Sequence, residues 1–397
     1  MKINLGVIGQ GYVGLPLSLA AAKSGFHVIG IDLDVNKVNK LNSGRSISED
    51  VLDELVSEQV KLGRYIATNS YDDVAFVEII IICVPTPLDS NGKPDLSILE
   101  QAVISFAKFL KKGSLVILES TVEPGTTRDF LIPLLESKSG LSRDEFDVAF
   151  SPERTDPGNK KWNLTNTPKI VAGFTVKSRK RAVDFYTKFV TTVVECESLE
   201  VAEIAKLLEN SFRLINISFI NEISIFCDKI GIDVKSVIRA ASTKPYGFLP
   251  FYPSIGIGGH CIPVDPLYLS NKAREIGAPI KIIELAAQIN QGIPEYFVEV
   301  AEKMLGELKS KKILVIGVAY KPNVSDVRET PSEVLITALK RRGARIDWHD
   351  ELVKEWNGSK SVPLSADYDL AILATPHDYL DLTMLGNVPI LNTHGSI

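Results

Sequence analysis

A six-residue loop with three glycines constrains this chain more than any other feature. The segment Gly9-Gln10-Gly11-Tyr12-Val13-Gly14 follows a β-branched run and opens an apolar helical pattern. In such a loop the first glycine permits a tight turn, the second lets a pyrophosphate approach the backbone, and the third lets the helix pack closely on the strand. Asp32 ends the next predicted strand, where its carboxylate would accept from a ribose and repel a 2′-phosphate. The sequence therefore predicts a Rossmann-like domain that binds NAD through Gly9, Gly11, Tyr12, Val13, Gly14 and Asp32.

Short apolar runs alternate with amphipathic helical patterns through the first half of the chain, which is typical of βαβ units on a parallel sheet. Each run ends in polar or turn residues, at the edge of the sheet where ligands of such folds bind. The predicted strands are Ile3–Ile8, Val28–Ile31, Ile79–Val84, Leu115–Glu119 and Val148–Phe150.

The pattern changes after Glu197. Leu199 to Lys229 has apolar residues at helical spacing with neither proline nor glycine, which predicts one helix about 45 Å long. Its apolar residues lie on more than one face, so we expect it to be buried between domains or in a homodimer interface. Thr243–Pro266 is rich in proline, glycine and aromatic residues and is predicted to be an irregular loop, followed by helix to about Leu308.

A third region begins at Lys311. Its predicted elements are strands Ile313–Val318, Ala344–Trp348 and Leu370–Ala374 and a helix Thr330–Arg342, with Thr330 as N-cap and Glu333 completing a capping box. The predicted fold class is therefore α/β, with two Rossmann-like parallel-sheet domains joined by a central helical region. We expect domains at 1–197, 198–308 and 309–397, the first for NAD and the last a second nucleotide-binding domain without a complete glycine fingerprint.

Bulk properties exclude several classes of protein. The 397 residues carry a formal net charge of -5, so no basic surface favours nucleic acid or anionic membrane. Cys83, Cys196, Cys227 and Cys261 form no C-x-x-C motif, which argues against a disulfide framework or a metal site. Apolar stretches are too short to span a bilayer, and the N-terminus runs straight into a strand, so we expect a cytoplasmic protein without a signal peptide.

The most unusual segment runs from Gly256 to Pro266, with the sequence Gly-Ile-Gly-Gly-His-Cys-Ile-Pro-Val-Asp-Pro. Its glycines would expose backbone N–H groups around Cys261, as an oxyanion site requires. A buried apolar role is the commonest fate of a free cysteine, but core packing does not require a glycine-rich loop. Asp265 has two open interpretations, an active-site carboxylate or the N-cap of the following helix.

Several ordered motifs resemble the UDP-glucose/GDP-mannose dehydrogenase superfamily over nearly the whole chain, and within it the UDP-N-acetylhexosamine 6-dehydrogenases. Besides the glycine loop, these motifs are Val84-Pro85-Thr86-Pro87, Glu119-Ser120-Thr121-Val122 with Gly125-Thr126-Thr127, Ser151-Pro152-Glu153-Arg154, Lys206 with Asn210, Gly258-Gly259-His260-Cys261, and Tyr320-Lys321 with Asp326-x-Arg328-Glu329-Thr330-Pro331.

The resemblance implies roles for the matching residues, in an enzyme of polysaccharide biosynthesis. Further cofactor-binding residues would be Lys37, Val84, Pro85, Thr86, Pro87, Ser120, Thr121 and Arg328. The substrate would be held by Glu153, Arg154, Lys206, Asn210, Tyr252, Gly256, Gly258, His260, Tyr320 and Lys321. The catalytic set would be Cys261, Lys206, Asp265, Asn210, Glu153 and Thr121.

The implied reaction oxidises the 6-hydroxyl of a UDP-linked sugar to a carboxylate in two steps. Lys206 or a water held by Asp265 would take the hydroxyl proton, and Cys261 would capture the aldehyde and carry it to a thioester. Water positioned by Thr121 and Glu153 would hydrolyse that thioester. Lys206 and Asn210 are four residues apart on a helix and point to one place.

Three of these residues have ordinary alternatives. Lys37 and Lys206 are equally explained as solvated helix lysines, and Glu153 as a surface-loop acid. The chain also departs from its relatives at Pro157, where many carry a second glutamate. Near the end, Asn392-Thr393-His394 stands in place of an Asp-x-Arg element, so no terminal arginine is assigned.

The loop from Thr243 to Pro253 and His260 resemble the UDP-N-acetylglucosamine 6-dehydrogenases, so we expect UDP-N-acetylglucosamine as substrate. The alternatives are UDP-N-acetylmannosamine, UDP-glucose or GDP-mannose. A catalytically inactive NAD-binding regulator belongs to a different class. A one-step hydroxyacid dehydrogenase would need neither Cys261 nor a second nucleotide domain.

Overall fold

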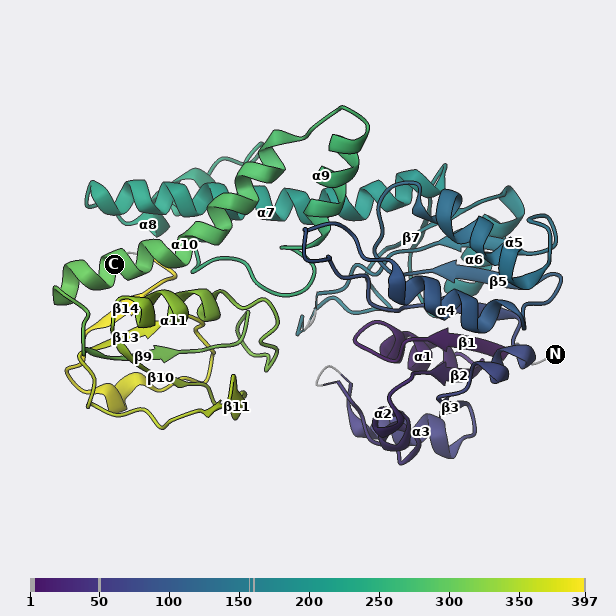
Figure 1. Cartoon of the computed structure of the whole chain (residues 1–397), viewed down its shortest axis with the longest axis horizontal. Coiled ribbons are helices and arrows are strands. Elements are labelled where there is room, and N and C mark those ends of the chain that lie inside the picture. Colours follow the sequence, from purple (N-terminus) through teal and green to yellow (C-terminus); the bar gives the residue numbers. More distant parts are fainter. Residues whose placement is uncertain (1–3, 49–50, 157, 160, 396–397) are drawn as a thin grey trace. The chain divides into compact units, whose positions relative to one another are not determined.

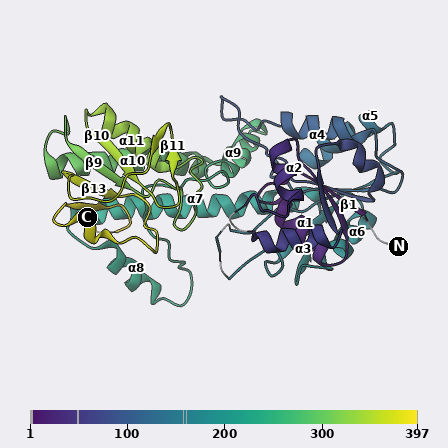
Figure 2. The same cartoon turned by 90° about the horizontal axis from the view of Figure 1, so that it is seen from below.

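The computed structural model describes residues 4–48, 51–156, 158–159 and 161–395. The chain forms two compact units, Met1–Leu208 and Glu209–Ile397. The boundary falls inside the long helix α7 (Leu199–Lys229), which Figures 1 and 2 show as one continuous ribbon. Among the described residues no helix has the length and apolarity needed to cross a membrane. The predicted division into three domains stays a prediction.

The first unit is built on an eight-stranded sheet with the order β3-β2-β1-β4-β5-β6-β7-β8. All neighbouring strands are parallel except β6 and β7. The strands are β1 (Asn4–Ile8), β2 (His27–Ile31), β3 (Tyr65–Thr68), β4 (Ile79–Ile82), β5 (Leu115–Leu118), β6 (Asp147–Phe150), β7 (Lys169–Gly173) and β8 (Val193–Glu195). The helices are α1 (Gly14–Lys23), α2 (Val35–Asn42), α3 (Asp53–Lys61), α4 (Ser97–Ala107), α5 (Ile132–Ser139) and α6 (Val176–Tyr186), with short helical turns at Tyr71–Phe76 and Thr127–Leu131.

The central strand β4 consists of four buried isoleucines, as expected for a parallel strand covered on both faces. Successive side chains of a strand point to opposite faces. Ile80 and Ile82 pack in one core with α4 and α5, whereas Ile79 and Ile81 pack in another with α1 and α6. This burial on both faces fixes β4, and with it the loop at its carboxyl end.

All five predicted strands of this unit are present within two residues of their expected ends. The end of the first, Ile3, lies outside the described residues. The sequence analysis missed β3, β7 and β8. Two of these begin with or contain charged residues, Lys169 and Glu195, which obscured the strand pattern.

The second unit combines helices with a four-stranded parallel sheet of order β10-β9-β13-β14. The strands are β9 (Lys312–Ile316), β10 (Arg345–His349), β13 (Leu370–Leu373) and β14 (Ile390–Asn392), beside a small hairpin of β11 (Glu355–Trp356) and β12 (Ser359–Lys360). The helices are α8 (Val234–Ser242), α9 (Asp265–Glu275), α10 (Lys281–Leu305) and α11 (Pro331–Arg341), with a short turn at Leu382–Leu385. The α/β class with two Rossmann-like sheets and a helical middle is confirmed.

Three details of the second unit differ from the predictions. The helix expected from Pro266 to Leu308 is two helices, because the chain turns at Gly277, which has φ +76°. Helix α8 was not predicted. Thr330 caps α11 by accepting from the Ser332 N–H, but Glu333 accepts from Asn357 instead of completing a capping box.

Candidate active site

The glycine loop of the first unit has the geometry of a dinucleotide site. Gly9 has φ +91°, and a Cβ there would lie 2.6 Å from the Cys83 carbonyl oxygen. A Cβ on Gly14 would lie 1.8 Å from the Gly9 oxygen. At Gly11, by contrast, no described atom comes within 4 Å of the added Cβ. Packing within the protein does not require glycine there, but the close approach of a pyrophosphate does.

Asp32 follows β2 beside this loop. One carboxylate oxygen accepts from the Gln10 N–H at 3.0 Å and lies 3.5 Å from the Lys37 ammonium. Gln10 was missed by the sequence analysis, although its side chain is fully buried. It donates to the Val7 carbonyl at 2.9 Å and accepts from the Tyr65 hydroxyl at 2.9 Å, which fixes the start of the loop. No local sequence signal marks such a long-range partner.

Two further predicted cofactor segments are joined by hydrogen bonds at the same carboxyl edge. The Ser120 hydroxyl donates to the Val84 carbonyl at 2.7 Å, and the Thr86 hydroxyl donates to the Thr121 carbonyl at 2.7 Å. The bonds therefore link the turn Val84–Pro87 after β4 to the segment after β5. Since β1, β2, β4 and β5 are neighbours in the sheet, the glycine loop, Asp32 and these two segments share one edge.

Glu153 follows β6, the next strand along. Its side chain is only 13% exposed and lies 3.4 Å from the Lys169 ammonium, so it is not a surface-loop acid. It also accepts from the N–H groups of Arg154 at 2.8 Å and Thr155 at 2.6 Å. Burial would raise the pKa of Glu153, but Lys169 and these hydrogen bonds outweigh it and hold the pKa below its usual value. The neighbouring Pro157 lies outside the described residues.

The first turns of α7 are fastened to this unit by carboxylates. Glu203 is buried and accepts from the N–H groups of Gly125 at 2.6 Å and Thr127 at 3.0 Å. Arg128 and Glu200 form an ion pair of 2.6 Å. Lys206, one turn after Glu203, is buried with 9% exposure, which excludes the alternative of a solvated lysine. Glu203 was missed because an acid in a helix pattern usually faces solvent.

In the second unit, Cys261 and Asp265 lie in one backbone turn. The Cys261 carbonyl accepts from the Asp265 N–H at 2.8 Å, and the cysteine is half-buried and not in a disulfide. Asp265 is buried and is the first residue of α9, while Val264 occupies the N-cap position. The Asp265 carboxylate accepts from the Asn210 amide at 2.5 Å. The N-cap interpretation of Asp265 is therefore wrong, because its side chain is directed to α7.

The glycines before Cys261 allow close packing against the predicted substrate residue Tyr320. A Cβ on Gly258 would lie 2.5 Å from the Glu329 oxygen, and one on Gly259, which has φ +84°, would lie 2.9 Å from the Tyr320 ring. The Gly259 N–H also donates to the Arg328 carbonyl at 3.1 Å.

Two asparagines missed by the sequence analysis hold the segment before these glycines. Asn290 of α10 accepts from the Ile257 N–H at 2.6 Å and donates to its carbonyl at 3.0 Å. Asn221 of α7 accepts from the Ser254 N–H at 2.9 Å. A polar amide inside an apolar helix pattern is the signal that could have identified both.

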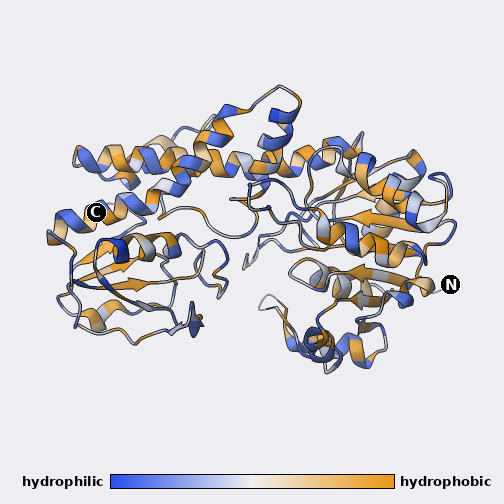
Figure 3. Ribbon diagram, in the orientation of Figure 1, coloured by the Kyte–Doolittle hydropathy of each residue, from blue (hydrophilic) through white to orange (hydrophobic). Residues whose placement is uncertain are grey.

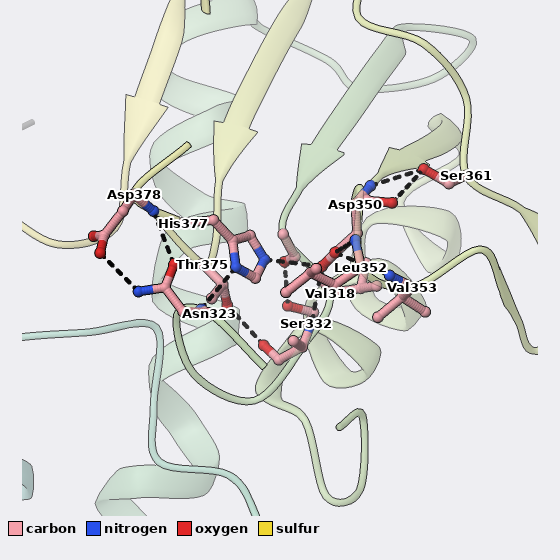
Figure 4. Close-up of polar contacts among 12 residues, drawn as sticks. Val318, Asn323, Ser332, Asp350, Leu352, Val353, Ser361, Thr375, His377 and Asp378 are labelled. Atoms are coloured by element: carbon pink, nitrogen blue, oxygen red, sulfur yellow. Dashed lines mark hydrogen bonds and ion pairs between the residues drawn. The ribbon is translucent and has the colours of Figure 1, made fainter. Parts of the chain in front are cut away.

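A buried carboxylate and a buried histidine clamp the loop that carries Tyr320 and Lys321 (Figure 4). Asp350, after β10, accepts from the Val318 N–H at 2.9 Å and lies 3.1 Å from His377 Nε2. The other ring nitrogen of His377 accepts from the Asn323 N–H at 2.9 Å. Asn323 has φ +64°, so this bond holds it in a strained conformation. The Asp350–His377 pair therefore forms hydrogen bonds to both ends of the 318–323 loop.

The remaining predicted residues are placed as follows. Arg154 donates to the Pro168 carbonyl at 2.6 Å, and Arg328 pairs with Asp326 at 2.9 Å. Tyr252 is exposed, and the Lys321 ammonium lies 5.8 Å from the centre of the Tyr320 ring. Burial and the nearby Lys235 lower the pKa of His394 to about 4, so His394 is neutral at pH 7 and does not supply the charge of a terminal arginine.

Predicted site residues thus gather within each unit. Thr121, Glu153 and Lys206 belong to the first, and Asn210, Cys261 and Asp265 to the second. Their assembly into one catalytic centre is part of the function proposed below.

Comparison with known families accounts for the predicted site residues of both units. Residues 1–190 match the NAD binding domain of the UDP-glucose/GDP-mannose dehydrogenase family, residues 200–292 its central domain, and residues 314–389 its UDP binding domain. The chain belongs to this family. It is an NAD-dependent UDP-sugar dehydrogenase by family, its glycine loop and Asp32 lie in the NAD domain, and the loop held by Asp350 and His377 lies in the UDP domain.

Individual relatives of this dehydrogenase cover nearly its whole length. It is 34% identical to the UDP-N-acetyl-D-glucosamine 6-dehydrogenase of Pseudomonas aeruginosa, over 94% of this chain and 90% of that one. It is also 34% identical to the UDP-N-acetyl-D-mannosamine dehydrogenase of Pyrococcus horikoshii, over 94% and 90% of the two chains. The solved structure of a UDP-D-ManNAc dehydrogenase from Pyrococcus horikoshii superimposes with a TM-score of 0.92 and 31% identity, covering 99% of this chain and 95% of that one.

The Asp350–His377 clamp leads to a testable prediction for nucleotide binding. His377→Phe removes both hydrogen bonds, so we expect UDP to bind about tenfold more weakly, a loss of about 1.4 kcal/mol. Calorimetric titration with UDP and, separately, with NAD measures this, and NAD affinity should not change. His349→Phe is the matched control, since His349 is another buried histidine of the same sheet and bonds to Val362 outside the loop. An equal loss of UDP affinity in both variants would contradict the clamp.

Proposed function

We propose that this dehydrogenase oxidises the C6 hydroxyl of a UDP-N-acetylhexosamine, UDP-N-acetylglucosamine first, to the carboxylate through a covalent intermediate on Cys261. The observation that carries the proposal is the glycine-rich turn in which the Asp265 N–H donates to the Cys261 carbonyl, with Asn210 of α7 bound to the buried Asp265 carboxylate at 2.5 Å. A half-buried free thiol held in such a turn is suited to nucleophilic catalysis, whereas core packing requires none of these features.

Two oxidations and one hydrolysis balance the reaction. NAD, when bound, supplies the hydride acceptor for both oxidations. The Cys261 thiolate adds to the aldehyde carbon after the first, forming a thiohemiacetal, and the second converts this to a thioester. Water then attacks the thioester carbon, and the carbon–sulfur bond breaks to release the carboxylate and regenerate the thiol. One alcohol, one water and two NAD⁺ give one carboxylate, two NADH and three protons.

Lys206 and Asp265 are the proposed groups for proton removal in the first oxidation. The burial of Lys206 and the anchoring of its helix turn by Glu203 support this role, as does the spacing that directs Lys206 and Asn210 to the same side of α7. A lysine ammonium would also favour the Cys261 thiolate. Thr121 and Glu153 are proposed to position and deprotonate the hydrolytic water, and the lowered pKa of Glu153 keeps its carboxylate ionised, as a proton acceptor must be.

The choice of sugar rests on the loop before Cys261. This loop exposes Tyr246, Leu249 and Tyr252, which offer apolar surface to an acetyl methyl. Such a methyl contact discriminates by only about 1–3 kcal/mol. The matched relatives include enzymes named for the gluco and the manno epimers at equal identity, so UDP-N-acetylmannosamine is the second candidate. The expected cytoplasmic location and the role in polysaccharide synthesis stay predictions.

A panel of sugar nucleotides tests the proposed reaction. NADH formation is measured with UDP-N-acetylglucosamine, UDP-N-acetylmannosamine, UDP-N-acetylgalactosamine, UDP-glucose and GDP-mannose under one condition. We expect an N-acetylated sugar to be preferred and two NADH to form per sugar consumed. Cys261→Ala should form no sugar acid yet retain NAD binding, while Cys196→Ala, which alters a free cysteine of the first unit, should leave turnover unchanged.

Each other outcome contradicts a distinct part of the proposal. Preference for UDP-glucose or GDP-mannose contradicts the inference of an N-acetylated sugar from the loop before Cys261. Sugar acid formed by Cys261→Ala at a comparable rate excludes covalent catalysis. No NADH with any sugar favours the inactive NAD-binding regulator.

We also propose that two copies of the chain associate through α7. Exposed apolar side chains recur along this helix at intervals of three, four or seven residues. Figure 3 shows apolar and polar residues alternating along the helix ribbons. The side chains that recur at these intervals, between 41% and 60% exposed, are Val201, Ile204, Leu208, Phe212, Phe219 and Phe226. A continuous apolar stripe of this length is typical of a protein interface.

Sedimentation measurements test this association. We expect the wild type to sediment as a dimer and the double variant Phe219→Glu/Phe226→Glu as a protomer of 43.5 kDa, because buried unpaired charges oppose the interface. Lys229→Glu, which alters an exposed charge on the same helix, is the control and should remain dimeric. A wild type that sediments as a monomer at micromolar concentration would refute the dimer.

A further inference from the structure

A cluster of buried ionisable side chains lies behind Glu153 in the first unit. We call Cys83, Glu119, Glu153, Lys169 and Tyr186 the Lys169 cluster. The Lys169 ammonium lies 3.1 Å from a Glu119 oxygen and 3.4 Å from a Glu153 oxygen. The Tyr186 hydroxyl donates to the other oxygen of Glu119, and the Lys169 ammonium lies 5.0 Å from the centre of the Tyr186 ring.

Four elements direct these side chains to one point. Cys83 follows β4, Glu119 follows β5, Lys169 is the first residue of β7, and Tyr186 is the last residue of α6. Lys169 contacts Glu153 directly, and Cys83, Glu119 and Tyr186 lie around the same ammonium. The guanidinium of the adjacent Arg154 is bound to the Pro168 carbonyl.

The Lys169 cluster is not explained by a contribution to folding stability alone. The side chains of Glu119 and Lys169 are 0% and 4% exposed, so their charges are removed from water at a large cost. A buried ion pair is often no more stabilising than well-packed apolar residues of similar volume. Two carboxylates share one ammonium here, which adds like-charge repulsion.

The two carboxylates are held in different ways. Glu119 is enclosed and receives Tyr186 and Lys169, and its burial raises its pKa. Glu153 receives two backbone N–H groups as well as Lys169, which outweigh its burial and lower its pKa. The shared ammonium therefore faces two carboxylates that differ in their other partners.

We propose that Lys169 is a positioning residue for Glu153, which it holds in place through an ammonium shared with Glu119. Lys169 touches neither cofactor nor sugar in this role, and it acts by fixing the charge and position of the Glu153 carboxylate. The inference rests on the proposed function, in which Glu153 takes a proton from the hydrolytic water. In this proposal Glu119 has the opposite effect on the pKa of Glu153, because the Glu119 charge competes for the same ammonium.

Replacing Lys169 and replacing Glu119 should shift the pKa of Glu153 in opposite directions, which a purely structural role of Lys169 would not produce. Without the Lys169 ammonium, the pKa of Glu153 should rise, and the fall in kcat on acidification should begin at higher pH. Without the Glu119 charge, the pKa of Glu153 should fall and the same limb should move to lower pH. A charge at this distance typically shifts a carboxyl pKa by about one unit or more.

The experiment measures kcat and KM against pH, with NAD and the preferred sugar nucleotide of the wild type. We expect Lys169→Met to move the acid limb up by about one pH unit with kcat reduced more than KM is changed. Lys169→Arg should restore the wild-type position, and Glu119→Gln should move the limb down. Lys177→Met is the matched control, because Lys177 pairs with Asp147 at the other end of β6 and should leave the limb unmoved.

The double variant Lys169→Met/Glu119→Gln covers the case in which Lys169→Met does not fold. It leaves Glu153 without either charged neighbour, and its limb should lie above that of Glu119→Gln. The inference would be overturned if the acid limb of kcat lay at the same pH in the wild type, Glu119→Gln and the double variant. It would also be overturned if Lys169→Met and Glu119→Gln moved this limb in the same direction.

A titration of the protein without substrate separates this inference from the proposed function. With ¹³C-carboxyl-labelled glutamate, the resonance that is missing from Glu153→Gln should titrate lower in Glu119→Gln and higher when Lys169 is replaced. Those shifts in a protein that oxidises no sugar would refute the proposed function alone. A resonance that does not move, in a protein that turns over, would refute the role of Lys169 alone.

Discussion

The hydrogen bonds of the buried Glu203 carboxylate are the constraint on which the rest of the site depends. They fasten the beginning of α7 to the N–H groups of Gly125 and Thr127, in the loop that follows β5. Lys206 follows Glu203 by three residues in the same unit. Asn210, four residues further along α7, belongs to the second unit and binds Asp265 there. Helix α7 therefore carries one anchored residue in each unit.

Buried charges recur wherever the structure must hold a loop without regular secondary structure. Asp350 and His377 fix the loop that carries Tyr320 and Lys321, and Lys169 fixes Glu153. Each pair has its desolvation offset by several hydrogen bonds, so removing one partner leaves a polar or charged group buried and unsatisfied. Such loops keep a defined shape before any ligand binds, which lowers the entropy lost on binding.

Much of this arrangement could be predicted from the sequence, and the reason is that the signals are local. The glycine loop, the strands on either side of it and the uninterrupted pattern of α7 depend on residues close in the chain. A Cβ on Gly9 or Gly14 would collide with backbone atoms of the protein. Gly11 instead borders open space, which a pyrophosphate can approach. The parallel sheet then brings the predicted segments after β4 and β5 to one edge.

Residues that act through distant partners could not be predicted in this way. Gln10, Asn290, Lys169 and His377 each fix a segment between 16 and 55 residues away in sequence, and nothing next to them indicates a partner. Asp265 resembled a helix cap because a capping carboxylate and a site carboxylate occur at the same position. In the structure Val264 occupies the cap position and the Asp265 carboxylate is bound by Asn210, while its catalytic role stays a proposal.

The most direct measurement of the central claim is the mass of the peptide that contains Cys261. Glu153→Gln should slow thioester hydrolysis, so after incubation with NAD and UDP-N-acetylglucosamine the account predicts a uronyl adduct on Cys261 that hydroxylamine removes. A Glu153→Gln protein that forms sugar acid at the wild-type rate, with Cys261 unmodified throughout, would contradict it.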